Sequence, residues 1–158
     1  MSFFRGADIG PTFIGPGLNI TFVATAAETD GAYIALETLV AVDSGPLLHI
    51  HHNQVETFYI VEGQLEIVLG DQVHEAKAGD FAHVSKGTPH RFLNRSQTPA
   101  KMMVTFVPAG DMEQFFREAF EQTADRHAPL RPINDALRQR LLEAGERHDL
   151  EFVPPPEA

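Results

Sequence analysis

Short stretches rich in β-branched and aromatic residues follow one another at regular intervals, and they constrain the fold of this chain more than any other feature. Each stretch ends at residues that favour turns, such as Asp30-Gly31, Gly63, Gly70-Asp71 and Gly87-Thr88-Pro89. The expected strands are residues 19–24, 32–42, 57–62, 65–69, 72–76, 81–84, 90–93 and 101–107. Strands at this spacing, with no helical periodicity between them, predict an all-β antiparallel sandwich or barrel.

The pattern becomes helical after Pro108. Asp111 is expected to cap a helix, with Gln114 as its capping-box partner. The apolar stripe of this helix is Phe115, Phe116, Ala119 and Phe120. A second helix is expected to start at Asn134, and Gly145 occupies the position where a glycine commonly ends a helix.

The chain therefore divides into three parts. Residues 1–17 form an irregular N-terminal arm, broken by glycine and proline; residues 18–108 form the β-barrel; and residues 109–158 form a helical C-terminal extension. We expect the two helices to pack on the outside of the barrel or at a subunit contact.

Composition excludes several classes of partner. A chain of 158 residues is long enough for one domain with a sizeable core. Its formal net charge of −10 argues against a nucleic-acid partner, because phosphates would be repelled. There is no cysteine, so a metal would have to bind histidine, carboxylate or backbone oxygen. We find neither a signal peptide nor a run of about 20 apolar residues, and we therefore expect a cytoplasmic protein with no membrane partner.

Three histidines and a carboxylate are spaced so that they could meet around one metal ion. Alternate residues of a strand share a face, so His49 and His51 point the same way. If residues 52–55 form a hairpin loop, Glu56 lies opposite His51, and Phe58 lies opposite His49. His90, which follows a tight turn, is the candidate for the fourth ligand.

Two motifs resemble those of the cupin superfamily. The run from His49 to Glu56, followed by Gly63, resembles the first cupin motif. The second motif is represented by Gly79, Gly87, His90 and Asn94. Two turn positions depart from the pattern, because Asp43 stands where the first motif has a glycine and Ser85 where the second has a proline.

The resemblance implies a double-stranded β-helix, or jelly roll, that is usually dimeric and binds one metal inside the barrel. It assigns His49, His51, Glu56 and His90 as metal ligands, and it assigns the glycines to turns. Asn94 is interpreted as an amide that stabilises a turn. The expected assembly is a homodimer.

Three imidazoles and one carboxylate leave coordination positions open for water, substrate or O2. The expected cofactor is one divalent transition metal per chain: Fe, Mn, Ni, Co, Cu or Zn. Glu56 could also act as a catalytic general base towards a hydroxyl of the substrate. Phe58, Phe92 and His83 are candidate substrate-binding residues, the two phenylalanines because they share the face of the ligands and could shape an apolar pocket.

Three functions remain open at this point. The first is a metal-dependent oxidoreductase that acts on a small aromatic or enolic compound, since the motifs resemble those of bacterial quercetinase-like dioxygenases. The second is an isomerase, cyclase or lyase in which the metal serves as a Lewis acid, as in polyketide-cyclase-like cupins. The third is a non-catalytic cupin that binds a small molecule.

Overall fold

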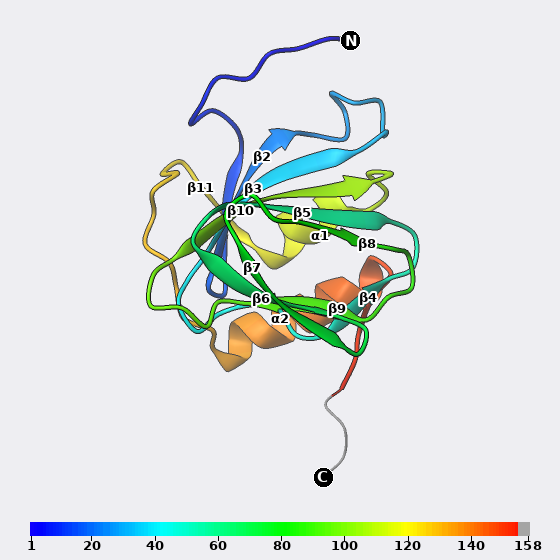
Figure 1. Ribbon diagram of the computed structural model, residues 1–158. Helices are drawn as coiled ribbons and strands as arrows, with labels where there is room; N and C mark the ends of the chain where they lie inside the picture. Colours follow the sequence, from blue (N-terminus) through cyan, green and yellow to red (C-terminus); the bar gives the residue numbers. More distant parts are fainter. Residues whose placement is uncertain (155–158) are drawn as a thin grey trace.

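The computed structural model describes residues 1–154, and its strands form two antiparallel sheets that face each other (Figure 1). The larger sheet consists, in spatial order, of β11 (Glu121–Thr123), β1 (Thr12–Gly15), β2 (Leu18–Ala24), β3 (Ile34–Val40), β10 (Ala100–Val107), β5 (Val55–Glu62) and β8 (Phe81–Val84). The smaller sheet consists of β12 (Leu150–Phe152), β4 (His49–His51), β9 (His90–Leu93), β6 (Gln64–Leu69) and β7 (Gln72–Lys77). The expected all-β class and jelly-roll barrel are confirmed.

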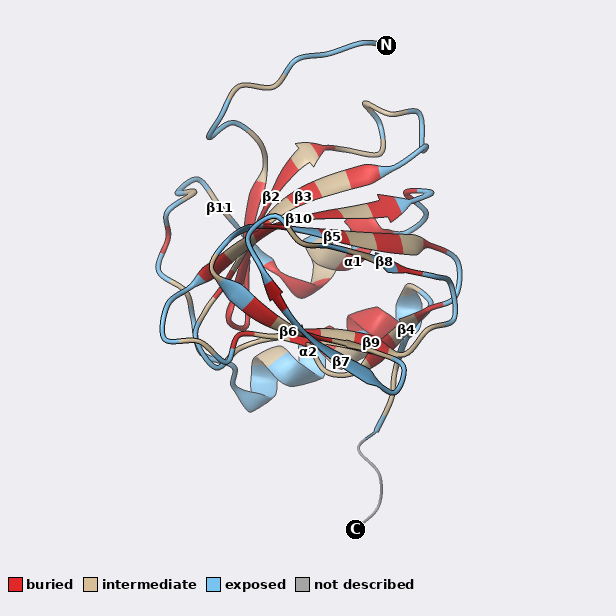
Figure 2. Ribbon diagram, in the orientation of Figure 1, coloured by how far each residue is buried: buried red, intermediate tan, exposed pale blue. Residues whose placement is uncertain are grey.

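Alternation along the strands decides which side chains fill the space between the sheets. In β3 and β10 every second residue is buried (Figure 2). These buried positions are Ile34, Leu36, Thr38, Val40, Ala100, Met102, Val104 and Phe106. Each of the eight strands expected from the sequence is present, with bounds that differ by at most two residues.

The connection that follows β4 differs from the expected hairpin. β4 pairs with β9 and β12, whereas β5 pairs with β10 and β8, so residues 52–54 cross from one sheet to the other. The expected pairing of Glu56 with His51, and of Phe58 with His49, is therefore wrong. The side chains of Glu56 and His51 still approach each other because both strands direct them into the space between the sheets.

The N-terminal arm is not irregular throughout its length. Its residues 12–15 form β1, which pairs with β2 on one side and with β11 on the other. The apolar side chains of Phe13 and Ile14 are buried there, and this burial explains why the segment is held in the sheet. The glycine and proline content of the arm concealed this short strand.

Asp43, in the connection between β3 and β4, is hydrogen-bonded to Asn94, which directly follows β9. Asp43 adopts a left-handed backbone conformation, with φ of 55°, which suits the glycine of the family motif and which aspartate tolerates better than most residues. Its backbone N–H donates to the carbonyl of Asn94 at 2.9 Å. The buried Asn94 amide donates to the carbonyls of Val40 and Thr98 and accepts from Ser96. The interpretation of Asn94 as a turn-stabilising amide is confirmed.

The first helix of the C-terminal extension packs into the barrel, whereas the second helix lies against the first with most of its residues exposed (Figure 2). It contains α1 (Met112–Ala119), β11, α2 (Asp135–Arg147) and β12, and Figure 1 shows α1 lying between the two sheets. The ring centroid of Phe116 in α1 is 6.4 Å from that of Phe22 and 5.9 Å from that of Phe106. The expected position outside the barrel is wrong for α1, because the phenylalanine stripe of this helix completes the core. Among the described residues, neither helix is long and apolar enough to cross a bilayer.

The ends of the two helices agree only in part with expectation. Asn134 caps α2, and its side-chain oxygen accepts from the backbone N–H of Leu137 at 2.9 Å, as predicted. In the described chain, Asp111 makes no such capping bond; its carboxylate instead accepts from His148 Nδ1 at 2.7 Å. Gly145 does not end α2 but lies inside the helix. A side chain at this position would place its Cβ 2.5 Å from Cε2 of Phe152, so the ring of Phe152 leaves room only for glycine.

His148 joins the end of α2 to α1. Its Nδ1 contacts Asp111, and its Nε2 lies 2.5 Å from Oε2 of Glu118, a carboxylate that Arg147 also contacts. Burial alone would lower the pKa of His148, but the two carboxylates outweigh it and raise the pKa. A raised pKa in the folded state means that this contribution to stability is present at acidic pH and is lost as the pH rises through that value.

Replacing His148 by glutamine should therefore lower the midpoint of thermal unfolding at about pH 6, by roughly one to two degrees, and should change it little at about pH 9. Calorimetric scans of both proteins at the two pH values measure this difference. A midpoint that falls equally at both pH values would show that the imidazolium charge does not stabilise the contact.

Candidate metal centre

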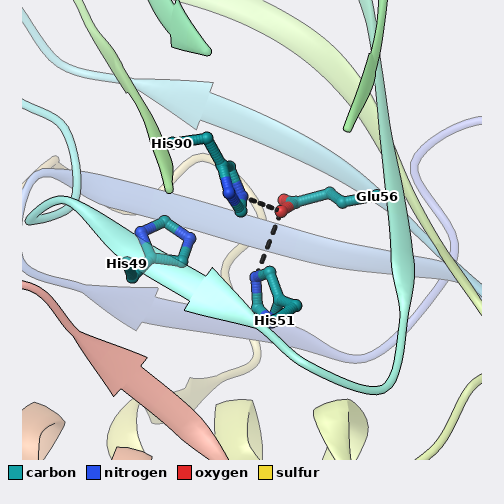
Figure 3. Close-up of side chains that lie close together, drawn as sticks. All are labelled: His49, His51, Glu56 and His90. Carbon is teal, nitrogen blue, oxygen red and sulfur yellow. Dashed lines mark hydrogen bonds and ion pairs between the residues drawn. The ribbon is translucent and has the colours of Figure 1, made fainter. Parts of the chain in front are cut away.

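Four buried side chains from three strands meet between the sheets (Figure 3). His49 and His51 lie at the two ends of β4, His90 begins β9, and Glu56 is the second residue of β5. Pairing of β4 with β9 places His49 opposite His90, and β5 brings Glu56 across from the other sheet. One ligand atom from each residue lies within 4.8 Å of the others. The structure thus brings together the complete ligand set expected from the sequence.

Two of the imidazoles are oriented by backbone carbonyls. His49 Nδ1 donates to the carbonyl of Leu47 at 2.7 Å, and His90 Nδ1 donates to the carbonyl of Thr88 at 2.8 Å. A carbonyl oxygen can only accept, so Nδ1 carries the hydrogen in both rings. Nε2 is therefore the atom left to coordinate a metal. Metal-binding histidines typically have this arrangement, which fixes the tautomer and the plane of the ring.

The contacts of Glu56 and His51 test whether a cation fits at this position. Oε2 of Glu56 lies 2.6 Å from Nε2 of His90 and 3.1 Å from Nε2 of His51 (Figure 3). Neither ring nitrogen of the buried His51 has a hydrogen bond of acceptable geometry within the described residues. Buried polar atoms rarely remain without a partner, so an unsatisfied imidazole beside a buried carboxylate fits a metal ligand set.

The electrostatics of the four groups favour a bound cation. Burial and the neighbouring imidazoles of His90 and His51 lower the pKa of His49 to about 3, so His49 is neutral at neutral pH. Burial alone would raise the pKa of Glu56, but His51 and His90 hold it well below its usual range. For His90, the hydrogen bond to Glu56 outweighs the effect of burial and raises the pKa. The site therefore holds an ionised carboxylate that requires a positive partner, either a proton on His90 or a metal ion.

A cavity of about 90 Å³ adjoins the four residues. Glu56, His49 and His51 form part of its wall, and most of the remaining wall is apolar. The two sheets contribute Leu18, Ile20, Leu36, Thr38, Phe92, Val104 and Phe106; the C-terminal extension contributes Met112, Phe115, Phe116, Phe120, Leu141, Leu150 and Phe152. Ile133, which directly precedes the cap of α2, also lines the cavity and is 45% exposed.

The three residues expected to bind substrate have different positions. Phe92 lines the cavity. Phe58 is fully buried beneath the centre, with its ring centroid 6.3 Å from that of His90, and does not form part of the cavity wall. His83 pairs with Thr57, on the face of the sheet opposite to that of Glu56, and is exposed. The expectation for His83 is therefore wrong, because the alternation of β8 directs its side chain away from the site.

The sequence did not reveal the contribution of β12. This strand pairs with β4, so that Leu150 lies opposite His51 and Phe152 lies opposite His49. The ring of Phe152 is 6.3 Å from that of His49, measured between centroids. Leu150-Glu151-Phe152 has the alternation of a strand, and this was the one local signal for it. β12 thus covers two of the candidate ligands, His49 and His51.

Comparison with known proteins identifies the family. Residues 36–106 match the model of the cupin domain. Quercetin 2,3-dioxygenase of Bacillus subtilis (strain 168) is 33% identical over 134 residues, which are 84% of this chain but only 39% of that protein. The chain therefore spans well under half the length of this relative.

Solved structures support the same assignment at the level of the fold. Ectoine synthase from P. lautus has a TM-score of 0.62 and 19% identity, with 85% of this chain and 94% of that chain covered. The polyketide cyclase RemF from Streptomyces resistomycificus has a TM-score of 0.57 and 18% identity, with 68% and 79% covered. The cupin domain match, the 33% identity to the quercetin dioxygenase and the two motifs show that the chain belongs to the cupin superfamily.

Proposed function

We propose that this cupin is a metal-dependent oxidoreductase of the dioxygenase type, acting on a small aromatic or enolic compound that binds the metal through an oxygen atom. The observation that carries the proposal is the position of the three histidines and one glutamate, buried together at the wall of an apolar cavity. The 33% identity to a quercetin dioxygenase favours this chemistry over the other reactions found in the superfamily.

His49, His51, Glu56 and His90 would hold one divalent metal, and their nitrogen and oxygen donors suit Fe, Mn, Co, Ni, Cu or Zn. Such an ion supplies open coordination positions for a substrate oxygen and, if it is redox-active, for O2. The ligand set carries a single negative charge, that of Glu56. Net positive charge would therefore remain to stabilise an enolate or phenolate.

The residues of the chain have separate roles in this proposal. The carbonyls of Leu47 and Thr88 hold His49 and His90 in place. Glu56 lies in the wall of the cavity, where it takes up the proton that a substrate hydroxyl loses on binding. The apolar wall formed by α1 and β12 keeps bulk water from the reacting atoms. The homodimer and the cytoplasmic location remain predictions.

Consumption of O2 tests the proposal directly. The metal-loaded protein is mixed with a flavonol, a β-diketone or a catechol, in an oxygen-electrode cell and in a matched anaerobic cell. We expect at least one compound to disappear together with O2 and to persist when O2 is absent. Equal turnover without O2 would contradict the proposal and favour Lewis-acid chemistry, and saturable binding without turnover would favour a binding protein.

A further inference from the structure

Thr38 occupies an interior position in the middle of the larger sheet. In β3 it is paired with Ile20 of β2 on one side and with Met102 of β10 on the other. The inward-facing residues of β3 are otherwise aliphatic, and Thr38 is only 3% exposed. A valine would fit the alternation and the apolar surroundings at least as well. A hydroxyl at this position therefore requires a separate explanation.

The hydroxyl of Thr38 has no hydrogen-bond partner within the described residues. Thr12 and Thr21, which are also buried in this sheet, satisfy each other through a bond of 2.9 Å between their hydroxyls. A buried hydroxyl without a partner lowers stability, and such groups are rare in folded proteins. Unsatisfied groups of this kind are found where a ligand or an ordered water completes the bond.

The Thr38 side chain lies in the wall of the cavity that adjoins the candidate metal centre. Within residues 1–154, the polar side chains of that wall are those of Thr38 and of the three ligands Glu56, His49 and His51. The others are apolar, including the rings of Phe92, Phe106, Phe115, Phe116, Phe120 and Phe152. One hydroxyl in an apolar wall is the type of group that orients a bound molecule.

Strand register places Thr38 far from the metal ligands along the barrel. Phe106 of β10 lies opposite Glu56 on one side and opposite Ile34 on the other. Thr38 is four residues further along β3 than Ile34, a distance of roughly 13 Å along the strand. The cavity thus has a charged polar end at Glu56 and a single hydroxyl towards its other end.

We propose that Thr38 determines specificity by hydrogen bonding an oxygen at the end of the substrate remote from the metal. The substrate class is then a flat, largely apolar molecule with a metal-binding oxygen at one end and a hydroxyl or carbonyl at the other. Only one part of this inference rests on the proposed function, namely that one end of the substrate binds the metal. The contact with Thr38 requires no particular reaction.

A matched pair of ligands isolates the contact. Galangin and kaempferol are flavonols that differ by a single hydroxyl on the phenyl ring, far from the oxygens that bind metal. Calorimetric titration of the metal-loaded protein with each compound gives the ratio of their affinities. The variants are Thr38→Val, which removes the hydroxyl at nearly constant volume, and Thr38→Ser, which keeps it. Thr105→Val is the control, because Thr105 lies on the outward face of β10.

We expect the wild-type protein, Thr38→Ser and Thr105→Val to bind kaempferol more tightly than galangin, by roughly tenfold or more. Thr38→Val should lose this preference and still bind galangin normally. Its thermal midpoint without ligand should equal or exceed that of the wild type, because an unsatisfied hydroxyl has been removed.

Three results would overturn the inference: binding of neither flavonol by the wild-type protein, an unchanged preference in Thr38→Val, or a lowered midpoint in that variant without ligand. The last result would show that the hydroxyl has a partner within the protein. Failure of the proposed function gives a different result, namely no consumption of O2 while the Thr38-dependent preference is still measured. The two failures are therefore distinguishable.

Discussion

Replacement of His90 by alanine should reduce the metal content from about one ion per chain to nearly none. His90 is fully buried, its ring is fixed by the carbonyl of Thr88, and its Nε2 faces Glu56 at 2.6 Å. The variant loses one of four donors and leaves empty space where a fully buried ring was. It also removes the partner of a buried carboxylate, so the metal-free variant should be less stable by about 3 kcal/mol.

Metal analysis by inductively coupled plasma spectrometry, after reconstitution with each candidate ion, measures the loss. His83→Ala is the matched control, because His83 lies exposed on β8 and makes no contact with the centre. The control should retain its metal, and circular dichroism should show that both variants are folded. Full occupancy in His90→Ala would show that the assignment of ligands is wrong.

Replacement of Glu56 by glutamine should decrease turnover by roughly a hundredfold or more. The substitution keeps the size and shape of the side chain but removes the one negative charge among the four residues. An amide cannot take up the proton of a substrate hydroxyl, and it is a weaker metal ligand than a carboxylate.

The rate should be measured as O2 consumed per bound metal ion, so that a loss of metal is separated from a loss of catalysis. Glu75→Gln, on the exposed face of β7, is the control and should behave as the wild-type protein does. A rate per metal ion equal to that of the wild type would rule out a role for Glu56 as the base and leave it as a ligand alone.

Strand periodicity and motif spacing were sufficient to predict the barrel and the four residues of the candidate metal centre. The alternation around His49 and His51 is local, so it holds whichever strand lies beside them. The partners of β4 depend on contacts distant in sequence, and this is why the hairpin expected at residues 52–55 proved to be a crossing between sheets. An incorrect strand pairing still led to the same four residues, because the family motif indicated them independently of the pairing.

Local patterns placed Phe92 at an apolar pocket beside the candidate ligands, but they did not predict how the C-terminal extension closes this pocket. The amphipathic stripe of α1 showed that it buries phenylalanines, but not that they face the interior of the barrel. The three-residue strand β12 is too short to be recognised by periodicity, yet it places Phe152 beside His49. The position of His83 depended on the register of β8, which the turn residues before it did not determine. Each of these features arises from tertiary packing.

The most direct test of the metal centre is the metal content of the wild-type protein purified without a metal-affinity column. Elemental analysis should find about one redox-active ion per chain, and extended X-ray absorption should report nitrogen and oxygen donors at roughly 2.0–2.2 Å. If His49, His51, Glu56 and His90 hold the ion, the ratio of metal to protein should be near one and the coordination shell should contain about three imidazoles. A protein that holds no metal, even after reconstitution, would contradict the assignment of these four residues as a metal centre.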